Sequence, residues 1–100
     1  MYDMKNLAKL KKIGELAPEG FKGFVAFDEA AFRDGAIPLK YKELMAVAVA
    51  LTTQCPYCIE VHAQKAKKAG ATEQELAETT LVAAALRAGG GVTHGTHALE

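Results

Sequence analysis

The chain has 100 residues and a mass of 10.6 kDa, the size of one small domain. Half of its residues are apolar and 24% are charged, which excludes an intrinsically disordered or fibrous protein. Twelve basic residues balance twelve acidic ones, so no net charge draws the chain to nucleic acid or to an anionic membrane. We expect a single domain over residues 1–100.

The N-terminal third predicts two helices. The first spans Asp3 to Leu16, with Asp3 as its N-cap. The second spans Glu19 to Arg33 and carries all four phenylalanines on a broad apolar stripe. Gly35 is expected to end it in the left-handed conformation, and Pro38 favours an extended connector.

The middle of the chain predicts a helical hairpin. A third helix is expected from Leu39 to Thr53, and its run Leu44–Leu51 is apolar on every side. Such a helix must be buried all round, which a 100-residue monomer can hardly achieve, so the run predicts a homo-oligomer. A fourth helix begins at Cys55-Pro56, where proline suits the first turn, and continues to Ala69, with Gly70 as its stop.

A fifth helix opens on a capping box, with Thr72 at the N-cap and Glu75 three residues later. It is expected to run to about Ala88, where the glycines 89–91 break it. Residues 92–100 form a short final helix or a loose tail. No strand is expected. The predicted fold is therefore all-α, a compact orthogonal or antiparallel bundle of five to six helices.

Two targeting features are missing from the sequence. The apolar run Leu44–Leu51 is only eight residues long, too short to cross a bilayer. The first fourteen residues contain no apolar region of the kind found in a secretory signal. The expectation is a cytoplasmic protein that binds neither membrane nor nucleic acid.

The candidate catalytic side chains are those of Cys55, Cys58 and His62. They occupy positions i, i+3 and i+7, which share one face of a helix. Two cysteines at this spacing, the first at a helix N-terminus, are typical of thiol redox sites, because the helix dipole stabilises a thiolate there. His62, one turn after Cys58, can accept the proton of that thiol.

Glu43 is the fourth candidate residue. If the third and fourth helices fold back near Gln54, then Cys58, His62 and Glu43 lie about 6, 12 and 16 Å from the turn. That order suits a relay in which the carboxylate orients the imidazole and the imidazole serves the thiol.

Other readings of the cysteine pair stay open. A structural disulfide is disfavoured without a secretion signal, and two inert buried cysteines are the simplest alternative. A zinc site would use Cys55, Cys58 and His62, with a fourth ligand from Glu43, His94 or His97. A c-type haem attachment is excluded because Ile59, not histidine, follows Cys58. A redox-active dithiol is the favoured reading.

The string Glu43, eleven residues, Cys55-x-x-Cys58-x-x-x-His62 resembles the signature of the alkylhydroperoxidase D-like branch of the carboxymuconolactone decarboxylase superfamily. The resemblance covers roughly Phe21 to Glu100, with the motif-bearing core at about 21–90. It implies an all-α fold that assembles as trimers or hexamers. It also implies a thiol-dependent peroxidase or disulfide reductase in antioxidant defence.

The resemblance also assigns roles. Cys58 is the proton-relayed thiol, Cys55 its disulfide partner, and His62 and Glu43 form the relay. The substrate is a hydroperoxide or a disulfide, and a lipoyl-bearing protein can serve as the external dithiol reductant. Neither a bound cofactor nor a metal is expected.

The sequence departs from the family pattern at Tyr57, which stands where the better-studied peroxidase carries a second histidine. Tyrosine cannot shuttle protons at neutral pH, so Tyr57 is an auxiliary candidate that can only hydrogen-bond. The decarboxylase branch of the superfamily is the alternative. That branch works without the cysteine pair and relies on other polar groups. In this chain, His94 and His97 are the candidates for those groups.

Overall fold

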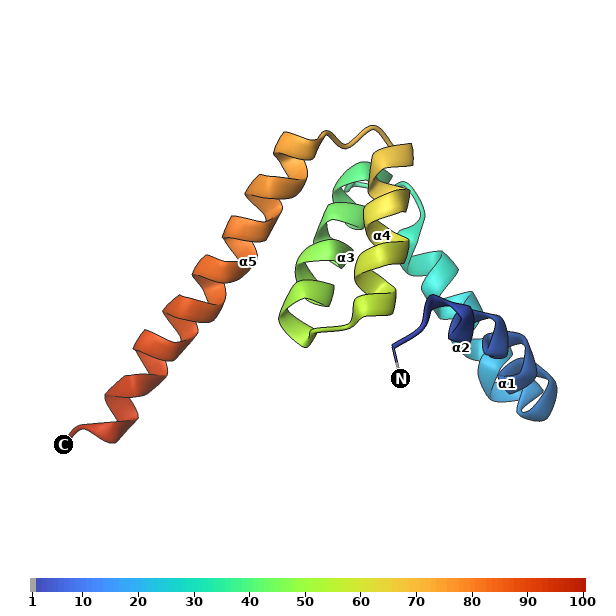
Figure 1. Ribbon diagram of the computed structural model, residues 1–100, viewed down its shortest axis with the longest axis horizontal. Coiled ribbons are helices and arrows are strands. Elements are labelled where there is room, and N and C mark those ends of the chain that lie inside the picture. The colour runs from blue at the N-terminus through green and yellow to red at the C-terminus, as the bar shows by residue number, and fades with distance from the viewer. Residues whose placement is uncertain (1) are drawn as a thin grey trace.

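The computed structural model describes residues 2–100, which are helical almost throughout (Figure 1). The order of elements is the 3-10 helix η1 Met4–Lys9, then α1 Leu10–Leu16, α2 Pro18–Phe32, α3 Leu39–Thr53, α4 Pro56–Lys68 and α5 Glu73–His94, and finally the 3-10 helix η2 Gly95–Ala98. The described residues contain no strand, so the predicted all-α class is confirmed. None of these helices is long and apolar enough to cross a membrane.

The α3–α4 hairpin is the centre of the fold. The two helices lie side by side, and α5 packs against α3 (Figure 1). The turn between α3 and α4 is made by Gln54, which adopts the left-handed conformation with φ of 57°. The buried apolar side chains are few and mostly small: Leu44, Val47, Ala50, Ala66 and Ala83. Alanine at these positions lets the helix backbones approach closely, at the cost of little buried area.

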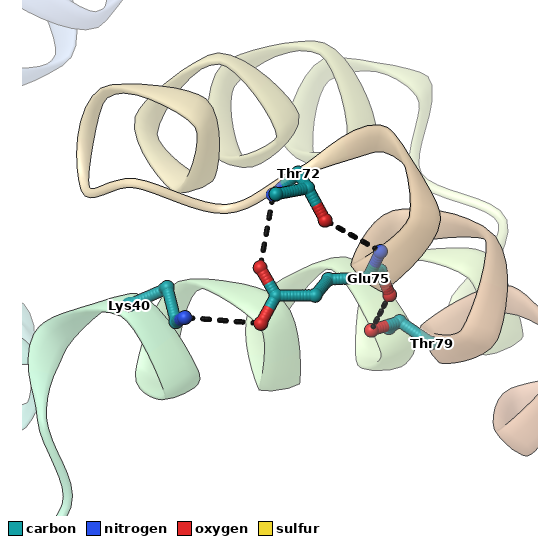
Figure 2. A network of polar contacts seen from close by, with 4 residues as sticks. All are labelled: Lys40, Thr72, Glu75 and Thr79. Atoms are coloured by element: carbon teal, nitrogen blue, oxygen red, sulfur yellow. Dashed lines mark hydrogen bonds and ion pairs between the residues drawn. The ribbon is translucent and has the colours of Figure 1, made fainter.

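The α4–α5 connection follows the sequence prediction. Gly70 has a φ of 101°, a conformation that favours glycine and ends α4. The capping box is present, because the Glu75 amide donates to Thr72 Oγ1 at 3.1 Å and the Thr72 amide donates to Glu75 Oε1 at 2.9 Å. The same carboxylate accepts a 3.0 Å hydrogen bond from Lys40, which joins the start of α5 to the start of α3 (Figure 2).

The helices η1, α1 and α2 form an arm on one side of the hairpin, and α5 extends on the other (Figure 1). Asp3 is the N-cap, as predicted, although the chain starts as a 3-10 helix and becomes an α-helix only at Leu10. α1 and α2 meet where Phe21 packs over Gly14. A Cβ added at Gly14 would lie 2.9 Å from the Phe21 ring. The molecule measures 53 × 34 × 29 Å along its principal axes.

Two expectations about glycine are wrong. The glycines at 89–91 do not break the last helix, which runs unbroken to His94. Glycine costs a helix only about 1 kcal/mol per residue, and the 22-residue helix keeps its hydrogen bonds through the triplet. Gly35 is not left-handed either.

The end of α2 explains why Gly35 has no capping role. The chain leaves α2 in the extended conformation at Arg33. Lys42 Nζ donates to the carbonyls of Ala31 and Arg33, at 2.9 and 2.6 Å. These carbonyls are among those that a left-handed glycine cap would otherwise help to satisfy. The connector is also held by Asp34, whose carboxylate accepts the Leu39 amide at 2.5 Å.

Candidate active site

The first cysteine caps the helix that carries the second. Cys55 is the N-cap of α4, and its Sγ accepts the backbone N–H of Cys58 at 3.3 Å. Pro56 occupies the first turn, where its missing N–H costs nothing. Both cysteines are free thiols and are partly buried. The arrangement puts one sulfur on the positive end of the helix and the other one turn along the same face.

The two thiols differ in acidity. Hydrogen bonds from the Cys58 thiol and the Cys58 backbone amide lower the pKa of Cys55 below its usual value. The hydrogen bond to Cys55, together with burial, raises the pKa of Cys58 from the usual 9.0 to about 11. Cys55 is therefore the more acidic of the two thiols and the one that ionises first, and Cys58 is the donor in the hydrogen bond between them.

His62 and Glu43 meet across the hairpin. His62 Nδ1 lies 2.6 Å from Glu43 Oε1, so α4 supplies the imidazole and α3 the carboxylate. Glu43 is only 4% exposed and is the one buried charged residue among residues 2–100. A buried carboxylate requires a partner, and the imidazole is that partner. The bond assigns Nδ1 as the donor to Glu43 and leaves Nε2 as the free nitrogen.

Cys58 and His62 share an open hollow of about 300 Å³. Its other lining residues come from the end of α2 and the second half of α3: Phe32, Ala46, Val49, Ala50 and Thr53. Glu43 does not line this hollow and borders a different one of about 350 Å³, together with Lys65 and Lys68. The Glu43–His62 pair therefore lies between the two hollows, one mainly apolar with a thiol and one lined by lysines.

Phe32 is a site residue that the sequence did not single out. Its ring stacks on the His62 imidazole, with ring centroids 5.1 Å apart and planes inclined by 12°. In the sequence, Phe32 is one of four phenylalanines on an apolar stripe, and nothing local distinguishes it from the others. Only the packing of the end of α2 against the hairpin selects it.

The remaining candidates lie elsewhere. The Tyr57 hydroxyl accepts hydrogen bonds from the Asn6 amide group at 3.0 Å and the Asp3 backbone N–H at 3.4 Å, so it faces the N-terminal segment. His94 and His97 are exposed at the far end of α5, with ring centroids 5.9 Å apart. Over residues 2–100, no three His, Cys, Asp or Glu side chains form a group that could hold a metal ion.

The sequence matches a known family over most of its length. The profile of the carboxymuconolactone decarboxylase family matches residues 18–100. The chain is 46% identical, over 76 residues, to uncharacterised protein 4 in the cox locus of Paracoccus denitrificans, covering 76% of this chain and 68% of that protein. It is 32% identical, over 87 residues, to an uncharacterised protein of Cupriavidus necator, covering 87% and 77%.

Solved structures share the fold. A carboxymuconolactone decarboxylase family protein from Legionella pneumophila aligns with a TM-score of 0.78 at 40% identity, over 82% of this chain and 73% of that one. A protein from Methanobacterium thermoautotrophicum aligns with a TM-score of 0.83 at 34% identity, over 90% and 98%. At these identities the all-α arrangement is common to all three chains.

Proposed function

Because the chain belongs to the carboxymuconolactone decarboxylase family, we propose that it is a thiol oxidoreductase that reduces a hydroperoxide or a disulfide at Cys55 and Cys58. The observation that carries this proposal is the Cys55 sulfur at the N-cap of α4, bonded to the Cys58 amide. The lowered pKa of Cys55 agrees with it. Two inert buried cysteines would need no histidine one turn away whose ring is hydrogen-bonded to a buried carboxylate.

Cys58 meets the peroxide, because Cys58 and His62 line the same hollow. With its pKa raised to about 11, the Cys58 thiol needs a base at neutral pH. His62 accepts that proton on Nε2, while Glu43 holds Nδ1 and stabilises the imidazolium. This is the same assignment that the family resemblance gives to these residues.

The oxidation then proceeds in two steps. The Cys58 thiolate attacks the peroxide, so that an S–O bond forms, the O–O bond breaks, and the leaving alkoxide takes the proton from His62. The Cys55 thiolate attacks the resulting sulfenic acid, so that an S–S bond forms, the S–O bond breaks, and the leaving hydroxide takes a proton from solvent to become water. An external dithiol, of which a lipoyl group is one example, reduces the disulfide by exchange and is itself oxidised.

Stopped-flow measurement of peroxide consumption by the reduced protein tests the proposal. Cys58→Ser should abolish the reaction, and His62→Gln should slow it by about 10²–10⁴-fold, the usual value of general base catalysis. Glu43→Gln should slow it less, and Glu60→Gln, at an exposed position of α4, is the matched control. A Cys58→Ser variant as fast as the parent would refute the peroxidase.

A second assay separates peroxidase from disulfide reductase. Mixing the oxidised protein with a reduced lipoyl dithiol should give the free thiols at Cys55 and Cys58. Exchange without peroxide consumption would make the protein a disulfide reductase alone. The decarboxylase alternative gains no support, because the end of α5 that carries His94 and His97 lies far from the hairpin (Figure 1).

The chain also acts as a homo-oligomer in this proposal. Its accessible surface is 7715 Å², whereas a compact monomer of 10.6 kDa exposes about 5,500 Å². Its radius of gyration is 16.6 Å, against about 13 Å for a compact domain of 100 residues. Large apolar side chains are exposed on α1, α2, α3 and α5, among them Leu16, Phe24, Phe27, Met45, Val49, Leu81, Val82 and Leu86.

The excess of about 2,200 Å² per chain, or about 4,400 Å² for a pair of chains, lies within the total of about 2,000–5,000 Å² that obligate interfaces bury. Partner copies would cover the exposed sides of α3, as the apolar run Leu44–Leu51 predicts. Light scattering coupled to gel filtration measures the molar mass directly. A stable 10.6 kDa monomer at micromolar concentration would contradict this part of the proposal.

A further inference from the structure

We propose that Phe32 and Lys42 are positioning residues, which hold the His62 imidazole in one orientation and make the end of α2 part of the redox site. The kinetic consequence rests on the function proposed above. The geometric part stands on contacts at the end of α2 and is tested separately.

Phe32 supplies the contact that the carboxylate cannot. Glu43 binds the imidazole at its edge, with 2.6 Å between Oε1 and Nδ1. One hydrogen bond restrains rotation about the side-chain bonds of His62, but it leaves the faces of the ring unsupported. The Phe32 ring lies nearly parallel to the imidazole, at a centroid distance of 5.1 Å and an angle of 12°. Together the edge contact and the face contact fix the direction of Nε2.

Lys42 holds Phe32 in that place. Its ammonium group donates to the carbonyls of Ala31 and Arg33, the residues on either side of Phe32. Both distances, 2.9 and 2.6 Å, are those of charge-assisted hydrogen bonds. A cation at the C-terminus of α2 is also favoured by the helix dipole. Lys42 precedes Glu43 in α3, so adjacent residues of one helix orient both contacts of the imidazole.

The position of Phe32 is specific to the site. Phe24 and Phe27 of the same helix are 60% and 72% exposed, whereas Phe32 is partly buried and lines the hollow that holds Cys58. The arm formed by α1 and α2 lies to one side of the hairpin (Figure 1). Movement of this arm would therefore reach the imidazole through the end of α2.

Proton NMR of the His62 ring tests the geometry. A stacked aromatic ring shifts the imidazole carbon-bound protons upfield, so Phe32→Leu should move those of His62 downfield and leave those of His94 and His97 unchanged. Phe32→Tyr should keep the parent shifts. Lys42→Met should move the His62 signals in the same direction as Phe32→Leu, and Lys22→Met, an exposed lysine of α2, should not. Unchanged His62 signals in both Phe32→Leu and Lys42→Met would overturn the proposal.

Kinetics of the reduced protein test the consequence. Phe32→Leu should lower the turnover number for peroxide about two- to tenfold, the factor that an aromatic pair contributes, with little change in KM. Phe32→Tyr should restore the rate, and Phe27→Leu should match the parent. Equal rates for Phe32→Leu and Phe27→Leu, or no rescue by tyrosine, would overturn the role. If the parent shows no thiol chemistry, the proposed function fails, while the NMR shifts still decide whether Phe32 and Lys42 hold the ring.

Discussion

Replacing Cys55 by serine should make Cys58 more acidic. In the parent protein the hydrogen bond to Cys55, burial, and the charge of the Cys55 thiolate together raise the pKa of Cys58 to about 11. A serine hydroxyl does not ionise, so the Cys55→Ser variant removes the charge of the thiolate and leaves Cys58 with its burial and a weaker hydrogen bond to a neutral acceptor. The pKa of Cys58 should therefore fall from about 11 toward its usual value of 9.0.

The size of the effect follows from the titration. A thiol with a pKa near 11 is a thiolate in about one molecule in ten thousand at pH 7, and a thiol with a pKa near 9 in about one in a hundred. Because the thiolate is the reacting form, Cys58 should be alkylated by iodoacetamide about tenfold faster, or more, in Cys55→Ser. Mass spectrometry of the Cys58 peptide, sampled between pH 6 and 11, gives the titration midpoint.

The reciprocal variants are the control. Cys58→Ala removes the side-chain donor to Cys55, so the pKa of Cys55 should rise toward its usual value. Cys58→Ser keeps an O–H donor and should leave the pKa of Cys55 lower than in Cys58→Ala. A Cys58 midpoint that is the same in Cys55→Ser and in the parent would refute the assignment of Cys55 as the thiolate.

Three further predictions concern stability and assembly. Thr72→Ala removes the acceptor of the Glu75 amide, so urea unfolding should show a loss of about 1 kcal/mol, and an unchanged midpoint would contradict the capping role. Gly70→Ala should cost about 1–2 kcal/mol because of its φ of 101°, whereas Gly91→Ala should stabilise α5 by up to about 1 kcal/mol, since an added Cβ meets no atom within 4 Å. Effects of the same sign would show that backbone conformation does not distinguish the two glycines. Leu86→Glu places a charge on the exposed face of α5, so light scattering should give a lower molar mass than the parent, and an unchanged mass would exclude that face from the interface.

Local sequence patterns predicted most of the helices and singled out the four candidate site residues that the hairpin brings together. The capping box at Thr72 and the stop at Gly70 depend on residues a few positions apart, so the sequence contains all the information they need. The same holds for Cys55, Cys58 and His62, because a helix places residues three and four apart on one face. Glu43 could be predicted for a related reason. When the third and fourth helices form a hairpin, only a few residues of the third helix can lie opposite His62.

The tertiary structure alone decided which distant groups meet. Phe32 lies in the site because the end of α2 packs against the hairpin. Gly35 has no capping role because Lys42 of α3 donates to the carbonyls at the end of α2. The glycines at 89–91 are helical, because α5 continues through them to His94. A local sequence pattern determines local conformation through residues that are close together in the chain. Contacts between segments are set by how whole helices pack, and no single segment contains that information.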